Sequence, residues 1–153
     1  MKLDRLDRKL LIALQEDGRI SNVDLAALVH LSESACLRRV RALEEDGLIE
    51  RYVALLNQKQ VGLGGIVFVH IALRREEQSE LAAFEAAIQN IPEVMECYLM
   101  TGEFDYLLQL VVSDMADFER LHNDALTRLP GVARVNSSVA IRTVQKTTVL
   151  PVQ

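Results

Sequence analysis

Residues 21–47 read SNVDLAALVHLSESACLRRVRALEEDG, and this stretch decides the first half of the fold. Ser21 and Ser32 each precede apolar residues at helical spacing. Serine is a common N-cap because its hydroxyl accepts a backbone N–H of the first helical turn. Gly47 suits the left-handed position just after a helix. We therefore predict a short helix after Ser21, a tight turn, and a second helix over residues 33–46, which is the order of a helix-turn-helix.

The flanking residues complete a small domain around this motif. Residues 4–16 read DRLDRKLLIALQE, with leucines at helical spacing and Asp4 as a suitable N-cap, which predicts a supporting helix. Residues 48–55, LIERYVAL, are predicted to form a short strand, the wing. We assign residues 1–56 to a winged helix-turn-helix DNA-binding domain.

The remainder of the chain has a different pattern. Residues 57–65 contain three glycines and no periodicity, which predicts a linker. Residues 66–153 then alternate apolar strands with amphipathic helices in the order βαββαβ, so the fold class is α+β with a ferredoxin-like second domain. The expected strands cover residues 66–73, 94–101, 106–112 and 132–141, with a further strand at 144–150, and the expected helices cover 79–90 and 114–129.

The helix over residues 33–46 has two distinct faces. At about 100° per residue, Cys36, Val40 and Leu43 fall on one side and form an apolar stripe. The opposite side presents a hydroxyl and two guanidinium groups, which bind base edges and phosphates in DNA. An ordinary solvated helix face is the alternative. The candidate DNA-binding residues are Ser32, Ser34, Arg38, Arg39 and Arg41.

Composition limits the classes of function. The 153-residue chain has a net charge of −5, so DNA binding would depend on locally placed arginines and not on general attraction. No apolar run is long enough for a membrane helix, and the N-terminal residues lack the apolar core of a signal peptide, which indicates a cytoplasmic protein. The two cysteines and three histidines are scattered, so neither a metal site nor a cofactor is expected.

The turn Gly102-Glu103-Phe104-Asp105 is a candidate site in the second half. A solvated hairpin turn is the simplest interpretation. Its backbone N–H groups and carboxylates could also bind the two charged groups of a free amino acid. A small enzyme using Glu103 and Asp105 is a further alternative, but no nucleophile, P-loop or dinucleotide motif accompanies them.

A sheet covered by two helices leaves one face open. The strands carry more apolar residues than one layer of two helices can cover. The uncovered residues would form a large apolar patch, so we expect this face to be buried against a second copy of the chain by two-fold symmetry. The residues on which this expectation depends are Val67, Val69, Tyr98, Met100, Leu108, Leu110 and Val139.

Two blocks of the sequence resemble the Lrp/AsnC, or feast–famine, family of transcription regulators. The first block resembles the N-terminal half of the family's proteins and covers Leu3–Asn57, LDRLDRKLLIALQEDGRISNVDLAALVHLSESACLRRVRALEEDGLIERYVALLN. The second block resembles the family's effector domain and covers Glu96–Phe118, ECYLMTGEFDYLLQLVVSDMADF, and Leu129–Val132, LPGV. The sequence departs from the family pattern at positions 103, 30 and 35, where Glu, His and Ala replace the more usual Asp, Gly and Pro.

The resemblance implies a regulator that binds double-stranded DNA, forms dimers and higher assemblies, commonly octamers, and binds a free amino acid between dimers. A sensing or oligomerisation module without DNA binding is the rival, but it would not need a helix-turn-helix with outward arginines. The effector-binding residues implied by the resemblance are Thr101, Gly102, Glu103, Asp105, Tyr106, Ser137, Ser138 and Val139.

Overall fold

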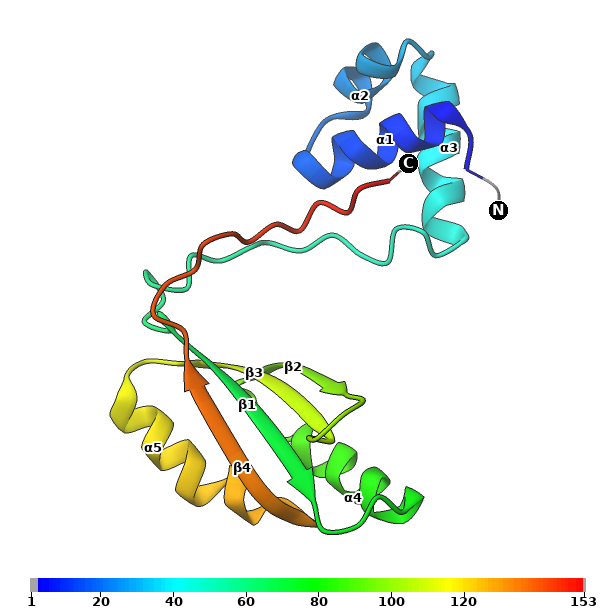
Figure 1. Ribbon diagram of the computed structural model, residues 1–153. Coiled ribbons are helices and arrows are strands. Elements are labelled where there is room, and N and C mark those ends of the chain that lie inside the picture. The colour runs from blue at the N-terminus through cyan, green and yellow to red at the C-terminus, as the bar shows by residue number, and fades with distance from the viewer. Residues whose placement is uncertain (1–2, 153) are drawn as a thin grey trace. The chain divides into compact units, whose positions relative to one another are not determined.

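The computed structural model describes residues 3–152, and the chain divides into two compact units (Figure 1). The first unit comprises the residues up to Leu55 together with those from Val144 onward. The second unit comprises Leu56–Thr143.

Three helices form the first unit: α1 (Arg5–Glu16), α2 (Asn22–Val29) and α3 (Glu33–Glu45). Each is preceded by an N-cap residue whose side chain accepts a backbone N–H of the first turn, as the sequence predicted. The apolar faces of the helices meet in one core. Its most deeply buried members include Leu10, Leu25, Val29, Cys36 and Leu43.

The turn between α2 and α3 depends on His30. This residue has φ 58° and ψ 46°, the left-handed conformation, and its N–H donates to the carbonyls of Ala26 and Ala27. Histidine tolerates this conformation better than bulky residues do. Across the same turn, the Asn22 side-chain amide donates to the Glu33 carbonyl at 2.9 Å. These contacts fix the direction in which α3 leaves the turn.

Two predicted strands are absent from the described residues. The predictions over residues 48–55 and 144–150 are both wrong, because neither segment pairs with another strand and a single extended segment cannot satisfy its backbone groups as a sheet does. The second segment instead meets α1, where the Gln15 side chain accepts from Leu150 N–H at 2.6 Å and donates to Leu150 O at 3.2 Å. Val152 packs against the helical core, so this segment groups with the first unit, whereas residues 66–153 were expected to form one domain.

The second unit is an antiparallel sheet of order β2-β3-β1-β4, with two helices on one face (Figure 1). This is the expected βαββαβ order. The helix expected at 114–129 is interrupted, because Ala125 has φ −122° and ψ −62°, outside the helical region, and only a 3₁₀ turn follows before Leu129, which is extended and precedes a proline. The elements are β1 (Gly65–Leu73), α4 (Gln78–Ile88), β2 (Val94–Leu99), β3 (Tyr106–Val112), α5 (Met115–Asp124), the 3₁₀ turn η1 (Leu126–Arg128) and β4 (Val132–Val139).

The two faces of the sheet differ in cover. On the helix side the apolar side chains of the central strands β1 and β3 are buried, whereas Phe68 and Tyr98 on the other side are 37% and 50% exposed. The expected open face therefore exists, and it exposes apolar rings. Alternate strand residues point to opposite faces. Four of the strand residues from which the open face was inferred are buried under the helices: Val67, Val69, Leu108 and Leu110.

Candidate DNA-reading face and effector pocket

The outer face of α3 carries the exposed arginines. Cys36 and Leu43 are fully buried on its inner side, while Arg38 and Arg41 are exposed on its outer side. Among the described residues, no hydrogen bond or ion pair engages either guanidinium. Both arginines line a shallow hollow of about 340 Å³, together with Ser34, Leu37, Ala42 and Glu45. The structure thus brings together three of the five predicted DNA-binding residues on one surface.

Ser32 lies at the start of this helix. Its hydroxyl accepts from Ala35 N–H at 3.3 Å and lies 3.3 Å from the Ser34 hydroxyl. Both side chains are exposed. A helix N-terminus with free N–H groups and hydroxyls is suited to a phosphate.

Arg39 points elsewhere. Its guanidinium donates to Asp4 Oδ2 and Asp7 Oδ1, each at 2.7 Å, and so ties α3 to the start of α1. Asp7 is buried, with 6% of its surface exposed. Hydrogen bonds from the Asp7 backbone N–H and from Arg39 lower the pKa of the Asp4 carboxyl. Sequence reasoning missed this pairing, although a spacing of about 100° per residue places Arg39 to the side of the face that carries Arg38 and Arg41.

The turn between β2 and β3 is held inside its own chain. The Asp105 carboxylate accepts from Leu73 N–H at 2.6 Å, and the Glu103 carboxylate accepts from Arg134 at 2.8 Å. The Arg134 guanidinium also lies 4.8 Å from the centre of the Phe104 ring. Gly102 has φ 114°, which favours glycine. Both carboxylates expected to bind an amino acid therefore already have partners, one of which, Arg134, sequence reasoning missed.

Tyr106, which follows this turn, is buried in the core of the second unit. Its ring stacks on Phe84 with ring centres 4.3 Å apart, and its hydroxyl donates to Glu85 at 2.8 Å. Burial, followed by the hydrogen bond to Glu85, raises the pKa of the Tyr106 hydroxyl. The side chain faces α4 beneath the sheet, so the structure does not place it with the exposed turn residues.

The three predicted β4 residues divide between the two sheet faces. Ser137 and Val139 pair with Val69 and Val67 on the helix side, whereas Ser138 pairs with Phe68 on the open side. Within one chain the eight predicted effector residues therefore do not form one cluster.

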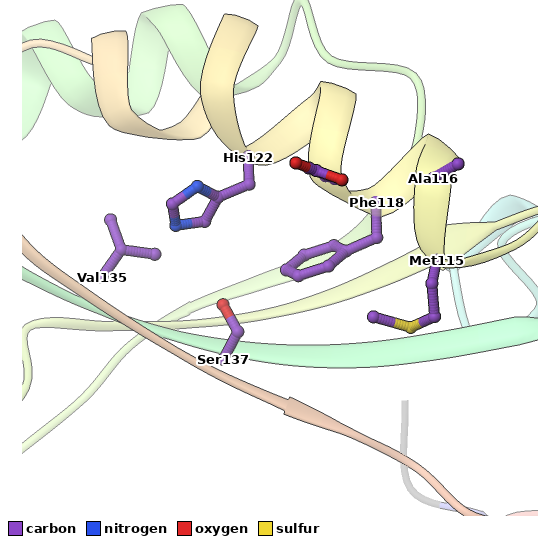
Figure 2. A pocket seen from close by; sticks show the side chains of 7 residues that line it. Met115, Ala116, Phe118, His122, Val135 and Ser137 are labelled. Atoms are coloured by element: carbon purple, nitrogen blue, oxygen red, sulfur yellow. The ribbon is translucent and has the colours of Figure 1, made fainter.

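A pocket of about 570 Å³ lies between α5 and β4. Figure 2 shows Phe118 and His122 from α5 and Val135 and Ser137 from β4 around this space. The Ser137 Oγ is buried and has no hydrogen-bond partner, the only side-chain atom in this state among the described residues. Because buried polar groups are normally hydrogen-bonded, this hydroxyl is suited to bind a polar group of a ligand in the pocket. Met115, Ala116 and Glu119 complete the lining, and sequence reasoning did not select any of the α5 residues.

The described part of the chain contains neither a metal-binding cluster nor a membrane-spanning helix. No group of three or more histidine, cysteine or acidic side chains is placed to hold a metal ion. No described helix is both long and apolar enough to cross a membrane.

The sequence matches two family models that together span both units. The winged helix-turn-helix DNA-binding model matches residues 3–50, and the Lrp/AsnC ligand binding domain model matches residues 66–150. The chain is 45% identical over 144 residues to the leucine-responsive regulatory protein of Salmonella typhimurium, which covers 94% of this chain and 88% of that protein. The identity to the same protein of Escherichia coli K12 is 44% with the same coverage.

Solved structures agree with these matches. A transcriptional regulator of Neisseria meningitidis, determined as a complex with L-Met, superposes with a TM-score of 0.94 at 40% identity, covering 98% of this chain and 97% of that one. An AsnC family transcriptional regulator of Agrobacterium tumefaciens gives a TM-score of 0.93 at 40% identity, covering 97% of both chains.

Proposed function

Because this chain belongs to the Lrp/AsnC family of DNA-binding transcription regulators, we propose that the outer face of α3 reads its operator. Arg38 and Arg41 contact base edges, and the hydroxyls of Ser32 and Ser34 bind the backbone phosphates. The observation that carries this proposal is the pair of exposed arginines without carboxylate partners in the described structure. Arg39 supports the same face indirectly, by holding α3 against α1.

The arginine assignment is tested by operator selection followed by titration. The full chain selects a common sequence from random double-stranded DNA, and affinity is then measured over a salt series. Arg38→Ala and Arg41→Ala should each cost about 1–3 kcal/mol if the arginine reads a base, with relaxed preference at one operator position. Arg75→Ala is the matched control, since Arg75 belongs to the second unit and is 70% exposed. Unchanged operator affinity in both α3 variants would contradict the assignment.

We further propose that the second unit binds a free amino acid with an apolar side chain. Met115 and Phe118 give the α5–β4 pocket apolar walls, while Glu119 supplies an acceptor for an ammonium group and Ser137 a free hydroxyl. The L-Met complex of the Neisseria regulator and the leucine-responsive relatives support this class of ligand.

The remaining predicted effector residues could bind the ligand where two copies of the chain meet. We propose that the turn from Thr101 to Asp105 of one dimer approaches β4 of another, so that residues separated within one chain share a ligand between dimers. Assembly, commonly octameric in this family, and amino-acid affinity would then be reciprocally linked. The protein would act in the cytoplasm, where its amino acid and its operator are both available.

Calorimetry with the twenty amino acids tests the effector proposal directly. L-Met or L-Leu should bind, and Glu119→Gln in the pocket and Glu103→Gln in the turn should each weaken binding, whereas Glu76→Gln should not. Light scattering with and without the ligand then reports the change in assembly. Absence of binding by all twenty, or undiminished affinity in both variants, would contradict the proposal.

The enzyme alternative is not retained. The relatives found by sequence and by structure are regulators of transcription, a class without catalytic activity. Glu103 and Asp105 are accordingly considered only as structural and effector-binding residues.

A further inference from the structure

Leu37 is an apolar residue on an otherwise polar surface. It is 39% exposed and lines the hollow that also contains Ser34, Arg38 and Arg41. It does not belong to the helical core, in which Cys36 and Leu43 are fully buried. A leucine in the same hollow as two exposed arginines keeps apolar surface in water when no partner is bound.

The position of Leu37 along α3 favours contact with base edges. It is in the second turn of a helix that begins at Glu33, and the N-terminal part of a recognition helix is the part that reaches the bases. Around the helix axis it lies roughly 40° from Arg41 and 60° from Ser34. A base pair read by Arg41 would therefore have the Leu37 side chain directly beside it.

The chemistry of the major groove leaves few partners for an aliphatic side chain. Three of the four bases present only hydrogen-bonding groups there, whereas thymine presents its C5-methyl group. We propose that Leu37 is a specificity-determining residue that packs on a thymine methyl group next to the base pairs contacted by Arg38 and Arg41. The inference rests on the proposed function, because it requires that the outer face of α3 reads DNA.

Replacement of thymine by deoxyuracil tests this contact, since it removes only the methyl group. The full chain first selects its operator, and each thymine of a half-site is then replaced in turn. One replacement should weaken wild-type binding about four-fold, equivalent to the roughly 0.8 kcal/mol of one buried CH₂ group. Leu37→Ala should bind the thymine operator more weakly and lose sensitivity to that same replacement, a coupling that a double-mutant cycle measures.

Ile12→Ala is the matched control, because Ile12 is also 39% exposed but lies on α1. It should keep the full uracil sensitivity of the wild type, and thermal unfolding should show both variants folded. Equal uracil sensitivity in Leu37→Ala and wild type would overturn the inference while leaving the arginine assignment intact. A selected half-site without a constant thymine, or a change of assembly mass in Leu37→Ala without loss of the uracil effect, would also overturn it. Failure of the wild type to select any common sequence would instead contradict the proposed function itself.

Discussion

At the scale of single residues, Arg39 shows how an apparent DNA contact can be a structural bond. Its guanidinium binds two carboxylates at the start of α1, those of the N-cap Asp4 and of Asp7, and Asp7 is buried. Arg39→Ala would leave the Asp7 carboxylate without its charged partner, which should cost about 1–3 kcal/mol of unfolding free energy. Urea unfolding of the full chain measures this loss. Arg51→Ala, at an exposed position of the same unit, should change stability little, and an equal loss in both variants would contradict the structural role.

The same ion pair predicts a dependence of stability on pH. The pKa of Asp4 in the folded chain lies below its ordinary value of 3.8, because backbone and Arg39 hydrogen bonds favour the carboxylate. A depressed folded pKa contributes stability that is present above the unfolded value and is lost as the pH falls through the folded value. We therefore expect part of the wild-type stability to disappear below about pH 4. In Asp4→Asn this part of the acid loss should be smaller, and identical acid unfolding profiles would contradict the expectation.

The sequence predicted the faces of α3 at this scale but not the partner of Arg39. Helical periodicity is local, so it places Cys36 and Leu43 inward and Arg38 and Arg41 outward without knowledge of the rest of the fold. The bond from Arg39 to Asp4 joins residues 35 positions apart and depends on how α1 crosses α3. The unpartnered hydroxyl of Ser137 was equally beyond prediction, because it follows from the packing of α5 against β4.

At the scale of elements, the predictions succeeded where a local signal was sufficient. The three N-caps were correct because a cap bonds to its own first turn. The β-strand predictions at 48–55 and 144–150 failed because a strand requires a partner, and an apolar pattern alone does not supply one. The sequence did not indicate which residues of the central strands face the helices, because their nearly continuous apolar runs lack a clear alternation.

The Gln15 side chain hydrogen-bonds the C-terminal segment to α1. The Gln15 amide both accepts from and donates to the backbone of Leu150, as a neighbouring strand would. Gln15→Ala should therefore speed the hydrogen exchange of the Leu150 amide and lower stability by about 0.5–1.5 kcal/mol. Gln15→Glu retains the acceptor and should preserve most of the amide protection. Unchanged exchange in Gln15→Ala would show that the packing of Val152 alone holds the segment.

At the scale of the whole molecule, a chain of net charge −5 cannot hold DNA by general attraction. If α3 reads DNA as proposed, one copy with two exposed arginines makes few contacts, and linkage of several copies in one assembly would increase the affinity. When two DNA-binding units are linked, the second binds at a high effective concentration, and this gain in affinity is lost when the linkage is broken. The proposed dimerisation would supply the affinity that a single copy of α3 lacks.

The open face of the sheet is the surface on which this linkage should depend. Phe68 and Tyr98 expose apolar rings on the side that no helix covers, and a second copy would remove both from water. Phe68→Glu places a charge at the centre of this contact and should shift the mass measured by light scattering toward the single chain. Operator affinity should fall at the same time, although α3 is untouched. Val61→Glu, at a 51% exposed position outside the sheet, should alter neither quantity. If Phe68→Glu kept the wild-type mass, any dimer would have to use another surface. The operator affinity of the assembly would then depend on that other surface.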